Sequence, residues 1–320
     1  MDAIVMIKKL REEKRVNNAG SAATIPSEAS KESEGLVTRI IPVIAANEPI
    51  FNKPNELWEN ESLFERRITI EGGTGRGRGS VVRLLEDPTG TLAGGNGATL
   101  WDCSLALTRI LAERYDGYDL TGTVVLELGA GLGLVGMAMA AMGARVVATE
   151  RAITLPLLRR NVDFNKVVVG GRVDVAELSW GAKETKAFLA ERSRSGDPPF
   201  DIVIGSDLVF PSNSDAYSLL ADTLTVLLDQ KTTDVKNSKT IDMWQSHEPR
   251  RPDVEAKFWD MLEDRGICAR QITLSDGILP NSHPSDITIY KLNCSPSSAA
   301  AAKTLDSIAQ AKQNDTFATP

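Results

Sequence analysis

The sequence predicts an α/β fold in which a parallel β-sheet has helices on both faces. Strand-like and helix-like segments alternate through the middle of the chain, which is typical of parallel strands joined by helices. Residues 124–150 read as strand, glycine loop, helix and strand, the first unit of a nucleotide-binding sheet. Ile267–Leu274 and Asp286–Leu292 read as strands that close the chain as an antiparallel pair.

The segment 124–150 is the strongest local signal. Its first residues form a short apolar run, typical of a strand buried on both faces. Three glycines follow at every second position: Gly129, Gly131 and Gly133. Glycine permits a close approach between backbone and ligand, and a helix of small and apolar residues begins directly afterwards, so its first amides can donate to that ligand. A second buried strand then ends at Glu150.

Two kinds of ligand compete for this loop. Gly131, Gly133 and Gly136 match the dinucleotide fingerprint, with Glu150 placed to bind a ribose. Glu127 argues against a dinucleotide, because a pyrophosphate needs a site free of carboxylates, whereas the ammonium group of an amino-acid ligand can pair with one. The segment ELGAGLG, residues 127–133, therefore resembles motif I of the seven-stranded S-adenosylmethionine (AdoMet) methyltransferases.

The other elements follow from hydrophobic periodicity and from glycine and proline punctuation. The expected strands are Leu63–Ile70 and Val81–Glu86, joined as an N-terminal hairpin by a glycine-arginine loop, then Arg172–Ala176, Phe200–Ser206 and Thr240–Trp244. The expected helices are Trp101–Arg114, Leu155–Asn165, Lys183–Arg194, Ser214–Gln230 and Val254–Asp264. Right-handed crossovers then place the ligand at the carboxyl ends of the first, second and fourth strands of the sheet.

Composition and charge narrow the range of partners. The chain has 320 residues, 42% of them hydrophobic and 25% charged, as in an ordinary globular protein. Its net charge of -7 gives no basic surface for nucleic acid. The three cysteines and two histidines lack the spacing of a metal site, and the odd, scattered cysteines indicate a reducing compartment. With no apolar segment of membrane-spanning length, we expect a cytoplasmic monomer, with the nucleus as the alternative compartment.

The chain divides into one expected domain and two tails. Residues 1–56 are expected to be mostly disordered, because residues 17–35 are rich in Ser, Ala and Glu and show no periodicity. Residues 57–293 form the expected folded domain, and 294–320 form a second disordered tail. The glycine-arginine run at 72–79 fits a nucleic-acid segment or a flexible hairpin loop, and the acidic total favours the loop.

Five segments in this order carry a family resemblance: LWDCSLAL at 100–107, ELGAGLG at 127–133, LRRNVDFN at 158–165, ELSWG at 177–181 and FDIVIGSDLVF at 200–210. Together they resemble methyltransferase family 16, the seven-stranded protein-lysine methyltransferases. The resemblance implies a Rossmann-like seven-stranded sheet with an N-terminal β-hairpin extension. It also implies AdoMet as cofactor and a lysine of another protein as methyl acceptor. The alternatives are methylation of a histidine or a small molecule, or a non-catalytic protein that binds AdoMet or a nucleotide.

The resemblance assigns roles to residues at the cofactor end of the site. Those that would hold the methionine part of AdoMet are Glu127, Gly129, Gly131 and Gly133. Glu150 would accept hydrogen bonds from the ribose hydroxyls. Trp180 and Trp101 would line the cofactor pocket, where an indole face suits an adenine or a sulfonium; core packing is the alternative for both. Ser206 belongs to the same expected set.

Asp207 and Phe210 match the family's acid-x-x-aromatic motif after the fourth strand of the sheet. Many members have tyrosine at the last position of the motif, where this chain has Phe210, so a hydrogen bond from that hydroxyl cannot operate in this chain. Asp207 would receive the incoming lysine ammonium, and Phe210 would line its channel through a cation–π contact. The alternative is that Asp207 caps the following helix while Phe210 packs in the core. The motif is not NPPY or DPPY, which argues against methylation of nucleic-acid bases.

Overall fold

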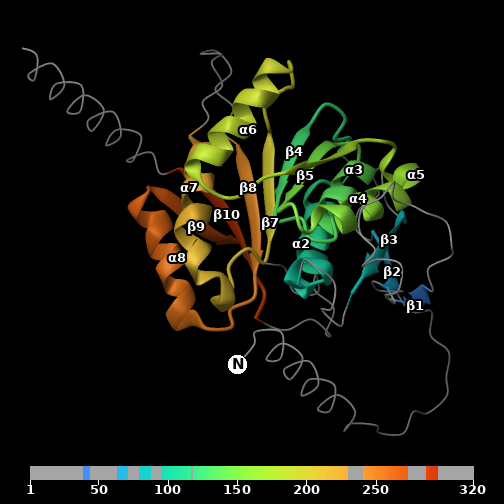
Figure 1. The fold of residues 1–320 in the computed structure, drawn as a ribbon, viewed down its shortest axis with the longest axis horizontal. Helices are drawn as coiled ribbons and strands as arrows, with labels where there is room; N and C mark the ends of the chain where they lie inside the picture. Colours follow the sequence, from blue (N-terminus) through green and yellow to red (C-terminus); the bar gives the residue numbers. More distant parts are fainter. Residues whose placement is uncertain are drawn as a thin grey trace, which may run out of the picture.

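The computed structural model describes residues 39–43, 63–70, 79–87, 95–116, 118–229, 241–272 and 286–294. Its main feature is a seven-stranded sheet (Figure 1). In spatial order its strands are β6 (Val173–Glu177), β5 (Arg145–Glu150), β4 (Val124–Leu128), β7 (Ile202–Ser206), β8 (Asp242–His247), β10 (Thr288–Cys294) and β9 (Ile267–Ile272). The first five run parallel, and β10 pairs antiparallel with both β8 and β9. The predicted fold class is confirmed.

Helices cover both faces of this sheet (Figure 1). The face that also carries the N-terminal strands is covered by α2 (Asp102–Arg114), α3 (Leu134–Ala141), α4 (Leu155–Phe164) and the short α5 (Lys166–Val169). The opposite face is covered by α6 (Ala182–Arg194), α7 (Tyr217–Leu228) and α8 (Pro252–Asp264). Short 3-10 helices, η2 (Gly95–Ala98) and η3 (Pro211–Ala216), precede α2 and α7. No helix in these described ranges is both long and apolar enough to span a membrane.

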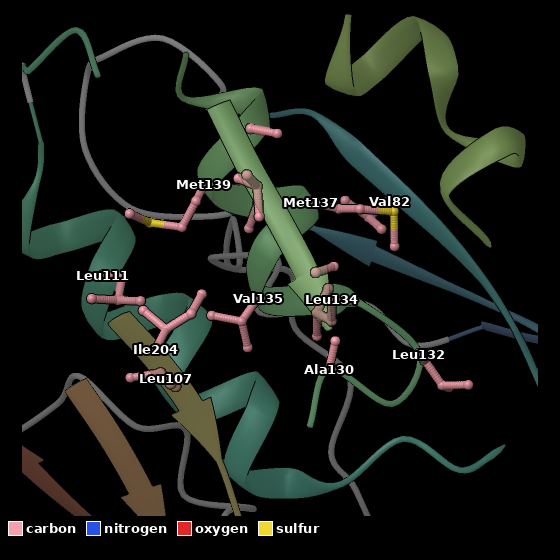
Figure 2. Packing of buried hydrophobic residues seen from close by; sticks show 14 of the residues in the cluster. Val82, Leu107, Leu111, Ala130, Leu132, Leu134, Val135, Met137, Met139 and Ile204 are labelled. Atoms are coloured by element: carbon pink, nitrogen blue, oxygen red, sulfur yellow. The ribbon is translucent and has the colours of Figure 1, made fainter. Parts of the chain in front are cut away.

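Helix α3 is the centre of the larger hydrophobic cluster. All its residues are buried, as expected of a helix that is apolar on every side. In Figure 2, Val135 lies among residues of α2 and β7, while Met137 lies beside Val82 of the N-terminal sheet. The start of α3, which follows the glycine loop, is therefore held from three directions.

The N-terminal strands form a separate antiparallel sheet in the order β1-β2-β3. Its strands are β1 (Arg39–Val43), β2 (Leu63–Thr69) and β3 (Val81–Glu86). The predicted hairpin corresponds to β2 and β3. Strand β1 was not predicted and lies inside the expected disordered segment 1–56. It contains Pro42, which is tolerated because β1 is an edge strand of this sheet. Most of that segment, residues 71–78 of the glycine-arginine loop and the tail 295–320 lie outside the described residues.

Two asparagines, Asn161 within α4 and Asn165 at its C-cap, dock this small sheet onto the main domain. Asn161 Oδ1 accepts a hydrogen bond from the Leu85 amide at 2.8 Å, and its Nδ2 donates to the Leu85 carbonyl at 3.1 Å. Asn165 makes the same pair of bonds with Arg83, at 2.8 and 2.6 Å. Four helical residues rise about 6 Å and two strand residues about 6.7 Å. Because these two distances nearly match, the asparagine side chains can bond the backbone of alternate β3 residues, as the backbone of a neighbouring strand would.

Candidate active site

A cavity of about 330 Å³ opens at the carboxyl ends of the parallel strands, within the size range of small-molecule sites. Residues that follow β4, β5, β6 and β7 form its walls, together with the loop that leads into α2. Strand β4 lies between β5 and β7, where the strand order reverses, and open α/β sheets bind ligands at this point. The cavity therefore lies where the sequence places the ligand.

The glycine loop lets the backbone approach both the cavity and the loop opposite. Gly131 has φ +55°, and a Cβ on it would lie 3.4 Å from the carbonyl oxygen of Gly97. A Cβ on Gly129, with φ +56°, would lie 2.8 Å from Leu208 Cδ2. Both glycines line the cavity, so a side chain at either would strain the backbone and crowd the site. Gly133, at the N-cap of α3, does not line it.

Glu127 lies beneath the glycine loop and is not among the residues that line the cavity. Its side chain is 2% exposed, and Oε2 accepts a hydrogen bond from the Gly136 amide at 3.1 Å. Burial raises the pKa of this carboxyl to about 8. A Cβ on Gly136 would collide with the same carboxyl oxygen. The third glycine of the dinucleotide fingerprint thus makes room for Glu127, which weakens the dinucleotide interpretation.

Glu150 ends β5 and brings a buried carboxylate to the cavity wall. Oε2 accepts a hydrogen bond from the Arg151 amide at 2.6 Å, and the Gly131 amide also donates to this carboxylate. Burial raises the pKa of Glu150, and these two amides partly oppose that rise. Each carboxylate has about four acceptor sites, so Glu150 can accept further bonds from hydroxyl donors of a ligand.

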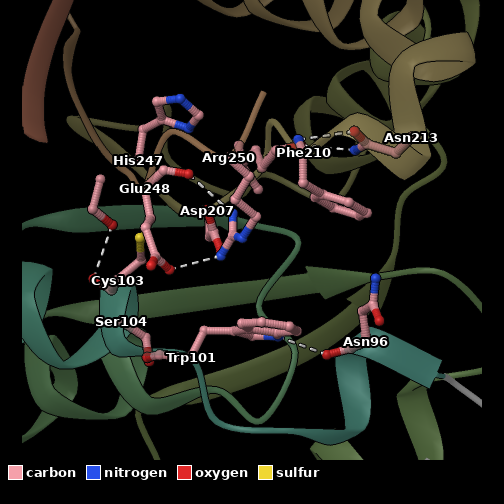
Figure 3. A network of polar contacts seen from close by, with 12 residues as sticks. Asn96, Trp101, Cys103, Ser104, Asp207, Phe210, Asn213, His247, Glu248 and Arg250 are labelled. Atoms are coloured by element: carbon pink, nitrogen blue, oxygen red, sulfur yellow. Dashed lines mark hydrogen bonds and ion pairs between the residues drawn. The ribbon is translucent and has the colours of Figure 1, made fainter. Parts of the chain in front are cut away.

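Both predicted tryptophans line the cavity, so neither is simply a core residue. Trp180 follows β6, and its ring lies 3.7 Å from the position of a Cβ on Gly129. The Trp101 Nε1 donates to the Asn96 carbonyl at 2.8 Å. Figure 3 shows this bond. Trp101 therefore fixes the loop that lines the cavity opposite the glycine loop, where Gly97 faces Gly131.

The N-terminal sheet supports the same loop. The Asp87 amide donates to the Ala98 carbonyl at 2.8 Å, and the Leu100 amide donates to Glu86 Oε2 at 3.1 Å. Glu86 is 1% exposed and also pairs with Arg66 of β2. The hairpin extension thus contributes to the geometry of the cavity, although it does not line it.

Asp207 and Phe210, with Ser206 beside them, line the part of the cavity that follows β7, two strands away from Glu150 at the end of β5. Asp207 is the only non-glycine residue of the described ranges with a positive φ, 56°. Its amide donates to the Ser246 carbonyl at 2.9 Å. The turn into η3 is closed by Asn213, whose Oδ1 accepts from the Phe210 amide at 3.1 Å. The Asp207 carboxylate makes a different contact, so the helix-cap alternative is not what the structure shows.

That contact is a bidentate ion pair with Arg250. Asp207 Oδ1 lies 2.9 Å from Arg250 Nη1, and Oδ2 lies 2.6 Å from Nη2. Glu248 Oε2 accepts a third bond from Nη2, at 2.9 Å (Figure 3). We did not predict Arg250 or Glu248, because they belong to none of the quoted motifs. The available signal was their position just after β8, the parallel neighbour of β7.

The described residues contain no group of three or more His, Cys, Asp or Glu side chains arranged to hold a metal ion. Cys103 is buried beside Asp207, and burial together with that carboxylate raises the pKa of its thiol. The charged residues that line the cavity are Glu150, Arg151 and Asp207, and the other polar side chains in its wall are hydroxyls and carboxamides.

Comparison with curated proteins gives partial matches. The chain is 33% identical over 135 residues to the protein N-lysine methyltransferase METTL21A of Mus musculus, covering 42% of this chain and 53% of that protein. It is 33% identical over 169 residues to the EEF1A lysine methyltransferase 3 of Xenopus tropicalis, covering 53% and 67%. The chain thus spans about half to two thirds of these relatives.

Comparison with solved structures finds a precorrin-6y C5,15-methyltransferase from Geobacter metallireducens, 16% identical, with a TM-score of 0.39, covering 66% of this chain and 96% of that one. A family model described as lysine methyltransferase matches residues 84–264, more than half of the sequence. This range contains the glycine loop, Glu150, Asp207 and Arg250. The chain belongs to the lysine methyltransferase family.

Proposed function

We propose that this chain transfers a methyl group from AdoMet to the side-chain amine of a lysine in another protein. One observation carries the proposal. A single cavity is lined at a first end by the glycine loop after β4 and by Glu150 of β5, and at a second, acceptor end by Asp207 and Phe210 after β7; the Trp101 ring also lines it. Membership of the lysine methyltransferase family supports the same reaction. The odd and scattered cysteines support a cytoplasmic location.

The residues at the first end fit AdoMet. The Glu150 carboxylate can accept from a ribose diol, and Gly131 leaves room for a ligand at the backbone. Leu178 and Trp180 give this part of the cavity an apolar wall suited to an adenine. When bound, AdoMet supplies a methyl group activated by a sulfonium. Glu127 lies below the loop, so any contact between it and the ammonium of the ligand stays a prediction.

The residues at the second end would receive the acceptor. A lysine with an unperturbed pKa near 10.4 is neutral in only about one molecule in 2,500 at pH 7. Asp207 would draw the ammonium in, and the Trp101 and Phe210 rings would remove part of its water, which favours the neutral amine. Phe210 has no hydroxyl, so it would orient the amine by contact alone. Positioning of the amine for in-line attack would provide most of the acceleration.

A direct test begins with ligand binding. Calorimetric titration of the purified chain should show AdoMet binding and no NAD binding, because the glycine loop has a carboxyl beneath it and Gly136 faces that carboxyl. NAD binding without AdoMet binding would overturn the proposal.

The acceptor is then found by labelling. The chain is incubated with methyl-labelled AdoMet and purified EEF1A, chosen because one relative is named for that substrate, and in parallel with a lysate from cells that lack the protein. Mass spectrometry should locate the label on a lysine Nζ. Label found only on histidine or on small molecules would refute lysine methylation.

A further inference from the structure

Asp207 lines the acceptor end of the cavity and belongs to a chain of three charged side chains in contact; the other two, Arg250 and Glu248, are not among the lining residues. Arg250 lies between Asp207, at 2.6 and 2.9 Å, and Glu248, at 2.9 Å. The side chains are 6% exposed for Asp207, 16% for Glu248 and 25% for Arg250. Two carboxylates and one guanidinium give this trio a formal charge of -1, in a setting where water screens the charges only weakly.

The guanidinium is held rigidly. Its Nη1 also donates to the Glu248 carbonyl at 3.1 Å, and its Cζ lies 5.3 Å from the centre of the Trp101 ring. Arg250 uses one acceptor position on each Asp207 oxygen, and a carboxylate has about four. Asp207 can therefore accept from an incoming amine while it stays bound to Arg250. Figure 3 shows the pair next to Trp101 and Phe210.

We propose that Arg250 is a positioning residue of the acceptor site: it fixes the Asp207 carboxylate and, with Glu248, sets the local charge at -1. This charge attracts an ammonium but does not hold it firmly in its protonated form. The proposal rests on the proposed function, because it concerns the lysine that would be methylated.

The physical reason lies in the protonation of the acceptor. Two carboxylates without Arg250 would carry a charge of -2, stabilise the ammonium and raise the pKa of the bound lysine. A guanidinium about 6 Å from the amine lowers that pKa by about two units, at an effective dielectric constant of about 20. The proton passes from the lysine to water, and the freed lone pair then forms the new N–C bond as the methyl–sulfur bond breaks.

Other titratable groups face this trio from the surrounding elements. Cys103 of α2 has its pKa raised by burial and by Asp207, so its thiol stays neutral. His247 of β8 has its pKa lowered by burial, which favours the neutral imidazole near pH 7. Glu255 of α8 lies 3.3 Å from His247 Nε2 and accepts from the Arg250 amide at 3.1 Å. These groups are the same in every variant below, so the comparison isolates the trio.

The test compares variants whose charges change in opposite directions. Arg250→Met makes the trio more negative, and Glu248→Gln makes it neutral. The midpoint of the pH dependence of kcat should rise by about two pH units in the first and fall in the second. The KM for the protein acceptor at pH 7 should rise only in Glu248→Gln. Arg250→Lys, which keeps the charge, should restore most of the wild-type profile.

Arg251→Met is the matched control. Its side chain is 57% exposed and pairs with Asp253 at the surface, so its pH midpoint should lie within about 0.3 unit of wild type. Circular dichroism checks that each variant folds; if Arg250→Met does not, Glu248→Gln carries the test. Folded variants with reduced kcat but unshifted midpoints would show a merely structural role and overturn the inference.

A second measurement separates this inference from the proposed function. NMR titration with n-butylammonium chloride, with AdoMet present, reports the charge of the site without turnover. The probe should bind Arg250→Met more tightly than wild type and Glu248→Gln more weakly. If the wild type methylates no lysine but this order holds, the proposed function fails and the charge assignment stands. If the three affinities are equal, the inference fails, whether or not lysine methylation is found.

Discussion

Replacing Glu127 with Gln should remove a specific dependence of stability on pH. Glu127 is 2% exposed, and burial raises the pKa of its carboxyl from 4.5 to about 8, against the opposing effect of the Gly136 amide. The folded protein therefore binds a proton here that the unfolded chain has lost between these two values. The stability that this bound proton gives to the folded state is fully present below about pH 4.5 and is lost as the pH rises through about 8.

The size of the effect follows from the width of that window. One proton bound only in the folded state changes the free energy of unfolding by about 1.4 kcal/mol per pH unit. Glutamine can still accept the Gly136 hydrogen bond through its amide oxygen, and it does not titrate. The variant should therefore gain about 3 kcal/mol relative to wild type between pH 5 and pH 7.5.

The assay is urea denaturation of both proteins at several pH values, followed by tryptophan fluorescence. Glu191→Gln on α6, where the side chain is 64% exposed, controls for the chemical change itself. A stability difference that stays flat from pH 5 to pH 7.5 would refute the buried, protonated state. AdoMet affinity is measured alongside: a loss of tenfold or more in Glu127→Gln would instead indicate a charge-assisted contact with the ligand.

Two further substitutions test the loop and the docking of the N-terminal sheet. Gly131→Arg should abolish AdoMet binding, because its Cβ already lies 3.4 Å from the Gly97 carbonyl. Gly171→Arg is the control, because Gly171 has a similar positive φ of +67° but no atom lies within 4 Å of a Cβ there. If calorimetry gave Gly131→Arg an AdoMet affinity within twofold of wild type, the assignment of the loop would be contradicted. Asn161→Ala should cost about 2 to 5 kcal/mol in urea denaturation, because the buried Leu85 amide and carbonyl each lose a hydrogen bond. A loss below about 0.5 kcal/mol would show that Asn161 does not dock the sheet.

Local patterns were sufficient to predict the main sheet. Buried strands are short apolar runs, and the glycine loop and closing acid of residues 124–150 have a distinctive spacing, so β4, α3 and β5 could be read directly. Strand β1 could not be predicted in this way, because it is short, contains a proline and pairs with a segment that lies 20 or more residues away in the sequence. Asn161 and Asn165 were visible as a pair one helical turn apart, but their partner strand became evident only in the structure.

In the site, too, local patterns predict some residues, whereas contacts between distant segments could not be predicted. Residues at strand ends, such as Glu150 and Asp207, follow from the topology of a parallel sheet. The ion pair of Asp207 with Arg250 joins residues 43 positions apart in the sequence, and no local pattern specifies it. The sequence singled out Glu127 as an acid inside the first strand of the glycine-loop unit. Whether its side chain points toward the ligand or beneath the loop depends on packing against Gly136, which periodicity does not describe.

The central claim is that this cavity transfers a methyl group from AdoMet to a protein lysine, with Asp207 receiving the amine. The most direct measurement is label transfer from methyl-labelled AdoMet to the identified protein, by wild type and by Asp207→Asn, with AdoMet affinity measured for both. We expect label on a lysine Nζ, unchanged AdoMet affinity, and a rate for Asp207→Asn lower by about ten- to a hundredfold, from the loss of one charge-assisted contact. A folded Asp207→Asn variant that methylates the same lysine at the wild-type rate would contradict the account.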